Sequence, residues 1–290
     1  MFDSLAHPIS YQNLIDYNAI KLDIKRLDLI HPQISGNKFY KLKYNLQHAK
    51  ELGLDTIITF GGAFSNHIAA TAYAAHYFGF KSIGIIRGEE LAHQTLNPTL
   101  ATACQFGMQL QFINRQEYRN KEQSDFIDKL RRHFPTAYII PEGGTNALAI
   151  QGCKEILTAK DRQNYDVICC AVGTGGTITG LIEASDAHQT ILGFSALKGD
   201  FLQQQVASLT HKMNWNILED YCFGGYAKTS IQLLDFIQSF EKTYQIPLEP
   251  IYTGKMLFGV FELIEQGHFA ANTRILVIHS GGLQGRQNLL

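Results

Sequence analysis

Residues 167–177 read VICCAVGTGGT, an uninterrupted apolar run followed by a glycine-rich turn. A continuous apolar run of this length is typical of a parallel strand buried on both faces of a sheet. The turn Gly173–Thr177 offers backbone N–H groups and two threonine hydroxyls to an anion, at the point where a helix begins. The same turn could also join strand to helix without a ligand. It lacks the lysine that ends a P-loop, which argues against a nucleoside-triphosphate site.

Further apolar runs of strand length alternate with helical patterns along the chain. The predicted strands are Thr56–Phe60, Ser82–Ile86, Gln109–Ile113, Tyr138–Ile140, Val167–Val172, Ile191–Phe194 and Arg274–His279. The clearest helical patterns are Asn66–Phe78, Glu122–Arg132, Ser230–Tyr244 and Gly254–Gln266. This alternation predicts an open, doubly wound α/β fold with helices on both faces of a mostly parallel sheet.

A second domain is expected inside the first. Residues 52–140 hold four strand-like runs, and a Gly-Gly turn follows both the first and the last of them. We therefore predict a small domain over residues 52–140 and a large cofactor-binding domain over residues 1–51 plus 141–290. Glycine-rich turns also follow the strands ending at Val172 and His279. Because ligands sit outside the carboxyl ends of strands in open α/β sheets, these turns predict a site there.

The composition excludes several classes of partner. With 25 basic and 26 acidic residues the net charge is −1, and no long charged run occurs, so the sequence predicts no nucleic-acid partner. No apolar stretch is long enough to span a bilayer, and the start of the chain does not read as a signal peptide. The five cysteines suggest free thiols in a reducing cytoplasm and no metal site. Charged residues are 18%, a low fraction that favours a homodimer.

A lysine cluster opens a predicted helix. Lys38 and Lys41 are three residues apart and share one helix face. They could be solvated surface residues, but cations fit poorly at the positive end of a helix unless a bound anion offsets the cost. An amine beside another cation also has a lowered pKa, which suits Schiff-base chemistry. Ser65 follows a strand and could either cap the next helix or face the cleft.

Several motifs together resemble a known family. Gly36-Asn37-Lys38-x-x-Lys41-Leu42 followed by Ser65-Asn66-His67 is similar to the 1-aminocyclopropane-1-carboxylate deaminase and D-cysteine desulfhydrase family, which belongs to the tryptophan-synthase-β-like, fold-type II pyridoxal-phosphate enzymes. The resemblance continues in order through Pro141–Leu148, Pro250–Lys255 and Ile278–Gly282. It implies two open, mostly parallel, twisted sheets, with pyridoxal 5'-phosphate in the cleft between the domains.

The resemblance also implies roles for individual residues. Lys38 corresponds to the lysine that forms a Schiff base with the cofactor, and Lys41 to a lysine that reaches its phosphate. Asn66 would bond the ring hydroxyl, and Ser65 would lie by the substrate carboxylate or act as a nucleophile. The phosphate would be held by Gly173, Thr174, Gly175, Gly176 and Thr177. Active-site tyrosines correspond to Tyr226 and Tyr252, and either Thr253 or Ser280 would meet the pyridine nitrogen.

Three departures from the family refine the prediction. The Gly-Thr-Gly-Gly-Thr spelling at 173–177 looks more like the cysteine-synthase branch, and Phe64 stands where the deaminases carry glutamine. Thr253 stands where the deaminases carry glutamate and the desulfhydrases threonine. A neutral hydroxyl leaves the ring a weaker electron sink, which suffices to expel a good leaving group but suits cyclopropane opening less well.

We therefore predict β-elimination and deamination of a small amino acid, of the D-cysteine desulfhydrase type. The alternative within the class is 1-aminocyclopropane-1-carboxylate deaminase. A nicotinamide dinucleotide-binding oxidoreductase would use Gly173–Thr177 but would leave Lys38 and Ser65 unexplained, and no acidic ribose partner follows the strand ending at Phe194. A non-catalytic relative that only binds a ligand is the remaining alternative.

Overall fold

The computed structural model describes residues 2–17 and 19–286. Within them the strands are β1 (Tyr11–Tyr17), β2 (Ile20–Arg26), β3 (Thr56–Gly61), β4 (Lys81–Arg87), β5 (Met108–Ile113), β6 (Ala137–Ile139), β7 (Val167–Val172), β8 (Thr190–Ser195), β9 (Trp215–Leu218) and β10 (Arg274–His279). They form a six-stranded sheet of order β1-β2-β10-β7-β8-β9 and a four-stranded sheet of order β5-β4-β3-β6. Every strand pair is parallel except β1 with β2. The predicted α/β fold with two mostly parallel sheets is confirmed.

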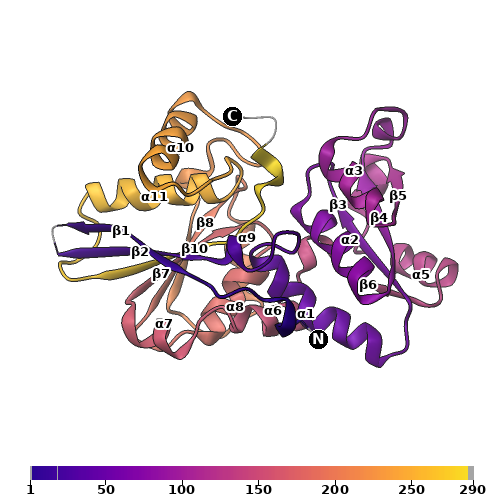
Figure 1. The fold of residues 1–290 in the computed structure, drawn as a ribbon, viewed down its shortest axis with the longest axis horizontal. Coiled ribbons are helices and arrows are strands. Elements are labelled where there is room, and N and C mark those ends of the chain that lie inside the picture. The colour runs from indigo at the N-terminus through magenta and orange to yellow at the C-terminus, as the bar shows by residue number, and fades with distance from the viewer. Residues whose placement is uncertain (1, 18, 287–290) are drawn as a thin grey trace.

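Helices flank both sheets, and the two layered units lie next to each other in Figure 1. The helices are α1 (Asn37–Glu51), α2 (Asn66–Phe78), α3 (Pro98–Gln105), α4 (Arg115–Arg119), α5 (Ser124–His133), α6 (Ala147–Lys154), α7 (Ala159–Asn164), α8 (Gly176–Ala184), α9 (Phe201–Ala207), α10 (Ile231–Tyr244) and α11 (Thr253–Glu265). None of the described helices is both long and apolar enough to cross a membrane.

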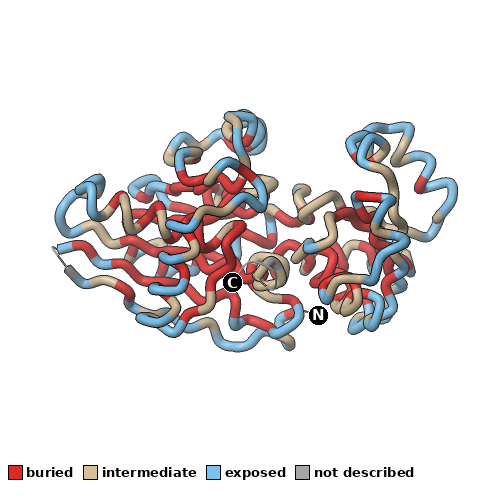
Figure 2. The backbone as a smooth tube through the Cα atoms, turned by 90° about the horizontal axis from the view of Figure 1, so that it is seen from above, coloured by how far each residue is buried: buried red, intermediate tan, exposed pale blue. Residues whose placement is uncertain are grey.

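The larger sheet is buried on both faces, which explains its continuous apolar strands. Ile168 and Cys170 of β7 pack into the core shared with α1, α6, α8 and α9. Cys169, between them, points to the opposite core, which α10 and α11 cover. Cys169 and Cys170 therefore face different layers, and both thiols are free. Figure 2 shows the buried segments running through the middle of both units.

The smaller sheet is covered in the same way. Ile68 and Ala72 of α2 pack with Leu100 of α3 on one face, and Tyr118 of α4 and Leu130 of α5 pack on the other. Helix α2 begins where Ser65 accepts a hydrogen bond from the N–H of Ile68 at 3.3 Å, and it ends at Gly79 in the left-handed conformation.

The four strands β3–β6 all fall within residues 52–140, and the strands of the larger sheet fall outside this range. Residues 1, 18 and 287–290, which belong to the expected large domain, lie outside the described residues. Three strands were not predicted from the sequence: β1 and β2, which form a hairpin at one edge of the larger sheet, and the short β9 at the other edge.

Candidate active site

A cavity of about 300 Å³ opens between the two sheets. Its walls come from the segments that follow the carboxyl ends of β3, β4 and β6 on one side and of β7, β8 and β10 on the other, together with the start of α1. All of the predicted site residues except Gly176 and Thr253 line it. Residues far apart in the sequence therefore meet at the position expected for a ligand site in this fold class.

Lys38 is held at the first turn of α1 by a close contact between two backbone turns. Gly36 has φ +66°. The backbone N–H of the next residue, Asn37, donates a hydrogen bond to the carbonyl of Ser280 at 3.1 Å. The Nζ of Lys38 donates to Asn37 Oδ1 at 2.9 Å, and the Nδ2 of Asn37 donates to Thr177 Oγ1 at 2.7 Å. The Lys38 amine is thus held where three segments meet: the start of α1, the glycine turn after β7 and the turn after β10.

The two lysines of the cavity both have lowered pKa values. Burial, and next to it the charge of Lys41, lowers the pKa of Lys38 to about 7. Burial also lowers the pKa of Lys41 to about 8. A substantial fraction of the Lys38 amine is therefore unprotonated near neutral pH, which is what a lysine that attacks a carbonyl needs.

The turn after β7 has the form of an anion cradle. Gly175 has φ +75° and immediately precedes α8, whose first N–H groups are free of helical partners. The Nζ of Lys41 lies beside it, donating to the carbonyl of Gly143 at 2.8 Å and to Thr145 Oγ1 at 3.0 Å. A Cβ built on Gly176 would lie 2.7 Å from that Oγ1 and 3.2 Å from that Nζ, so a side chain there would push Thr145 and Lys41 out of place beside the cradle.

The Ser65-Asn66-His67 segment lines the opposite wall. The Oδ1 atom of Asn66 is buried without a hydrogen-bond partner, as expected of a group that awaits a donor from a ligand. His67 is buried, and its Nε2 meets Thr59 Oγ1 at 2.8 Å. Since that hydroxyl donates its proton to the carbonyl of Ile140, it accepts the Nε2–H of His67. Burial holds the pKa of His67 well below its usual range, so the ring is neutral.

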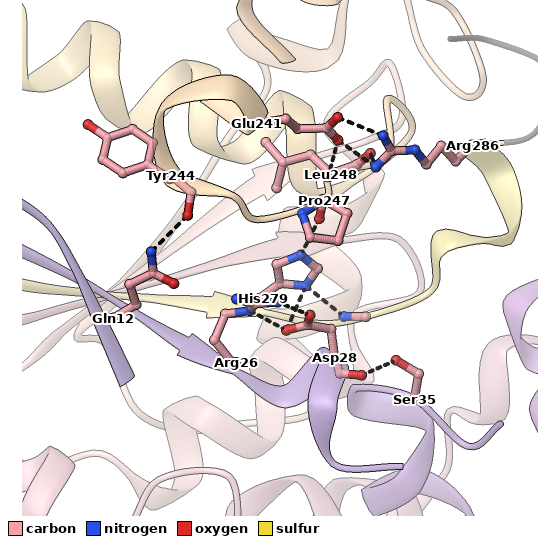
Figure 3. A network of polar contacts seen from close by, with 11 residues as sticks. Gln12, Arg26, Asp28, Ser35, Glu241, Tyr244, Pro247, Leu248, His279 and Arg286 are labelled. Atoms are coloured by element: carbon pink, nitrogen blue, oxygen red, sulfur yellow. Dashed lines mark hydrogen bonds and ion pairs between the residues drawn. The ribbon is translucent and has the colours of Figure 1, made fainter. Parts of the chain in front are cut away.

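A network of buried polar groups fixes the turn that carries Ser280 (Figure 3). His279 donates from Nε2 to the carbonyl of Pro247 at 2.8 Å, and its Nδ1 accepts the N–H of Gly281 at 3.2 Å. Burial lowers the pKa of His279, which agrees with a neutral ring that donates on one side and accepts on the other. Asp28 is bound by Arg26 and accepts at its carbonyl from Ser35 at 3.0 Å, next to the Gly36 turn. The network thus holds both turns that frame the cavity.

Two tyrosines close the wall that the larger sheet contributes. The rings of Tyr226 and Tyr252 meet edge to face, with centroids 6.2 Å apart. Burial, and the proximity of Tyr226, raises the pKa of Tyr252 well above its usual range, and burial also raises the pKa of Tyr226. Both hydroxyls are therefore protonated at neutral pH and can donate hydrogen bonds into the cavity.

Thr253 does not fit the predicted contact with the pyridine nitrogen. It is fully buried at the start of α11 and does not line the cavity. Its hydroxyl donates to Glu249 Oε1 at 3.2 Å and accepts from the N–H of Glu249. The Glu249 carboxylate is itself saturated by the N–H groups of residues 251–253. Of the two candidates for the nitrogen, Ser280 alone faces the cavity.

Comparison with known proteins agrees with this geometry. Residues 9–281 match the family described as pyridoxal-phosphate dependent enzymes. The chain belongs to this family. A Thermotoga maritima protein named provisionally as a 1-aminocyclopropane-1-carboxylate deaminase is 31% identical over 96% of this chain and 94% of its own. An Arabidopsis thaliana protein named as a bifunctional D-cysteine desulfhydrase/1-aminocyclopropane-1-carboxylate deaminase, mitochondrial, is 30% identical over 97% of this chain and 78% of its own.

A solved structure of a homologue of 1-aminocyclopropane-1-carboxylate deaminase superimposes with a TM-score of 0.83 at 26% identity, covering 97% of this chain and 91% of that one. The chain is thus a pyridoxal-phosphate-dependent enzyme of the lyase and deaminase kind, with the fold-type II architecture. The alternative of a nicotinamide dinucleotide enzyme is not supported, because the family match assigns a different cofactor.

The cavity also contains residues that the sequence did not single out. Arg87 is the last residue of β4, and Glu142 follows β6, so both sit at carboxyl ends of strands. Applying the strand-end rule to every predicted strand, and not only to those followed by glycines, would have found Arg87 directly after the run Ser82–Ile86. Asn37, Glu142 and Thr145 lie within the motifs that resemble the family, but none of them had a predicted role.

Proposed function

We propose that this enzyme eliminates the β-substituent of a small amino acid in the manner of a D-cysteine desulfhydrase. With D-cysteine the balanced reaction consumes one water and yields pyruvate, hydrogen sulfide and ammonia. The proposal extends to the individual residues, whose roles rest on their positions around the cavity and on the resemblance to the family.

The observation that carries the proposal is the lack of a free carboxylate on the cavity wall. Within the described residues, Glu142 is the one carboxylate that lines the cavity. It accepts from the hydroxyl of Tyr118 at 2.8 Å and pairs with Lys121 at 3.1 Å, so it is already neutralised. Ser280 offers only a neutral hydroxyl. Such a wall cannot hold a proton on the pyridine nitrogen, which suits loss of a good leaving group better than opening of a cyclopropane ring.

The residues around the cavity fit pyridoxal phosphate. Lys38 would hold its carbonyl carbon, Asn66 its ring hydroxyl, Ser280 its ring nitrogen, and Gly173–Thr177 with Lys41 its phosphate. When bound, the cofactor supplies a conjugated system that takes up the electron pair left at the substrate's α-carbon.

Proton transfer falls to this chain's own groups. As a free amine, with its pKa lowered to about 7, Lys38 would accept the proton from the α-carbon of the substrate. Tyr226 and Tyr252 keep their protons and can donate to the departing sulfur or position the substrate. The α-carboxylate would lie against the start of α2, where Ser65 and free N–H groups form an anion-binding end.

The second candidate is 1-aminocyclopropane-1-carboxylate deaminase. It is favoured by the names of relatives from Thermotoga and Pyrococcus species. One assay decides between the two. Cofactor-loaded enzyme is given D-cysteine, L-cysteine, β-chloro-D-alanine and 1-aminocyclopropane-1-carboxylate, and release of oxoacid and ammonia is followed. We expect turnover of the β-substituted compounds, whereas efficient turnover of the cyclopropane substrate alone would reverse the proposal.

Three further parts of the proposal are a homodimer, a cytoplasmic location, and the division into domains of residues 52–140 and of 1–51 plus 141–290. The low fraction of charged residues supports the homodimer, and the grouping of β3–β6 into one sheet supports the division into domains. The cysteines are free thiols, and Cys104 alone among them is exposed, which fits a reducing compartment. Light scattering on the purified enzyme measures the oligomeric state directly.

A further inference from the structure

Arg87 lies on the substrate side of the cavity. It ends β4, and in the smaller sheet its predecessor Ile86 pairs with Gly61, the residue at which the turn leading to Ser65 begins. Its side chain lines the cavity although the residue remains exposed to solvent. Arg87 therefore sits at the rim, beside the wall assigned above to the substrate and across from the glycine turn of the larger sheet.

The guanidinium group of Arg87 is held in place. Its central carbon lies 5.9 Å from the centre of the Tyr118 ring, in a cation–π contact. The Tyr118 hydroxyl is anchored on Glu142, so the ring is a fixed platform. Gly62 lies next to the guanidinium, since a Cβ added there would be in van der Waals contact with Arg87 Nη2, at 3.5 Å. An arginine fixed on an aromatic ring loses less freedom on binding than a mobile one.

The charge of Arg87 is not neutralised by the described part of the chain. Among residues 2–17 and 19–286, no carboxylate lies within ion-pair distance of it. The nearby carboxylate of Glu142 is taken by Tyr118 and Lys121. A preoriented guanidinium at a cavity rim without a partner favours a ligand that brings an anionic group.

Two of the anionic groups expected in this site have other places. The cofactor phosphate has the turn Gly173–Thr177 and Lys41 on the larger sheet. The substrate's α-carboxylate has the start of α2 at Ser65. Arg87 is the remaining cation that lines the described part of the cavity, and it shares that lining with Tyr226.

We infer that Arg87 selects substrates whose β-substituent ends in a carboxylate. This inference rests on the proposed β-elimination and names its substrate class: a cysteine thioether with a distal negative charge. In the reaction the α-proton goes to the enzyme, the Cβ–S bond breaks with its electron pair going to sulfur, and the anionic thiol departs past Arg87. The remaining three-carbon fragment takes up one water and leaves as pyruvate and ammonia, as in the proposed reaction of D-cysteine.

The test uses two substrates that differ in charge but hardly in shape, S-carboxymethylcysteine and S-carbamoylmethylcysteine, each in both enantiomers. The holoenzyme is compared with Arg87→Gln, with Arg87→Lys, which keeps the charge but not the planar fork, and with Arg131→Gln. Arg131 is an exposed arginine on α5 paired with Asp128, so its removal is a matched loss of charge outside the cavity.

We expect the native enzyme to favour the carboxymethyl substrate by about tenfold in kcat/KM, the size of one charge-assisted hydrogen bond. Arg87→Gln should remove that preference by slowing the anionic substrate alone, and Arg131→Gln should retain it. Equal rates for the two substrates in the native enzyme, or an equal loss on both in Arg87→Gln, would overturn the inference.

A binding measurement separates this inference from the proposed reaction. Calorimetry with adipate, a dicarboxylate of matching length, and with its monoamide reports the second charge without turnover. If the native holoenzyme binds adipate more tightly than the monoamide, and Arg87→Gln abolishes that difference, the inference is supported. If in addition neither thioether is cleaved, only the proposed elimination fails. Equal binding of adipate and its monoamide by the native holoenzyme contradicts the inference.

Discussion

Replacing Gly36 by alanine should separate the two turns that hold Lys38 and Ser280. Gly36 has φ +66° and ψ −141°, a conformation essentially confined to glycine. A Cβ atom built on Gly36 would lie 1.7 Å from the carbonyl oxygen of Ser280. Since that oxygen belongs to the backbone and not to the end of a flexible side chain, the chain itself has to move.

The expected loss of unfolding free energy is the sum of two costs. The backbone conformation costs about 1–3 kcal/mol for a residue with a Cβ. Forcing an additional methyl group into a packed contact costs about 1–3 kcal/mol more. The total of about 2–6 kcal/mol is a large share of the roughly 5–15 kcal/mol that stabilises a typical domain. Affinity for the cofactor should fall as well, because Lys38 follows directly in the displaced turn.

Gly53→Ala is the matched control. Gly53 also has positive φ, +69°, but nothing lies within 4 Å of the position of its Cβ, so only the backbone cost of about 1–2 kcal/mol applies. Urea unfolding of both variants, with and without cofactor, gives the two free energies. An equal loss in Gly36→Ala and Gly53→Ala, with unchanged cofactor affinity, would refute the argument that this backbone contact organises the site.

Three further predictions follow from the site. The rate at which the apoenzyme reacts with pyridoxal should rise with pH through a midpoint near 7, since only the unprotonated Lys38 amine attacks. Lys41→Met should move this midpoint to higher pH, because it removes a like charge beside Lys38. A midpoint near 10 in the native protein would contradict the pKa argument. Gly176→Ala should weaken retention of pyridoxal phosphate about tenfold, because the added Cβ would displace the Lys41 amine, but it should leave pyridoxal binding unchanged. Equilibrium dialysis measures both affinities. Equal effects on both ligands would contradict the assignment of a phosphate cradle to Gly173–Thr177. Lys255→Met should lower the unfolding free energy by about 2–4 kcal/mol in urea titrations, because the buried Nζ donates to the carbonyls of Cys222 and Gly225 at 2.7 and 2.8 Å. If the variant unfolds at the same urea concentration as the native protein, these carbonyls find other partners.

The sequence predicts the strands of this fold well where both faces of a strand are buried. It fails at β2, whose charged residues hide its burial pattern. Lys25 is buried because it pairs with Asp161 at 2.5 Å, and Arg26 because it pairs with Asp28 at 2.7 Å. The Lys25–Asp161 pair depends on the tertiary structure, because a sequence window around β2 cannot show a partner on α7.

The site was predictable to the extent that its motifs follow strands. Ser65 and the turn at 173–177 could be found because glycines and polar residues stand directly after apolar runs. Lys38 was indicated by its pairing with Lys41 at the start of a helix and by the resemblance to the family. Thr253 could not be placed, because its position next to Tyr252 does not show that its side chain turns back to Glu249. Arg87 is followed by a single glycine, Gly88, and not by a glycine-rich turn. Its contact with Tyr118, which is bonded to Glu142, appears only in three dimensions.

The most direct test of the account is to find which lysine carries the cofactor. Enzyme loaded with pyridoxal phosphate is reduced with borohydride, digested, and mapped by mass spectrometry. We expect the pyridoxyl group on Lys38, with no label in Lys38→Ala. A label on Lys41, on Lys255 or on any other lysine in the native enzyme would contradict the central claim that Lys38 holds the cofactor.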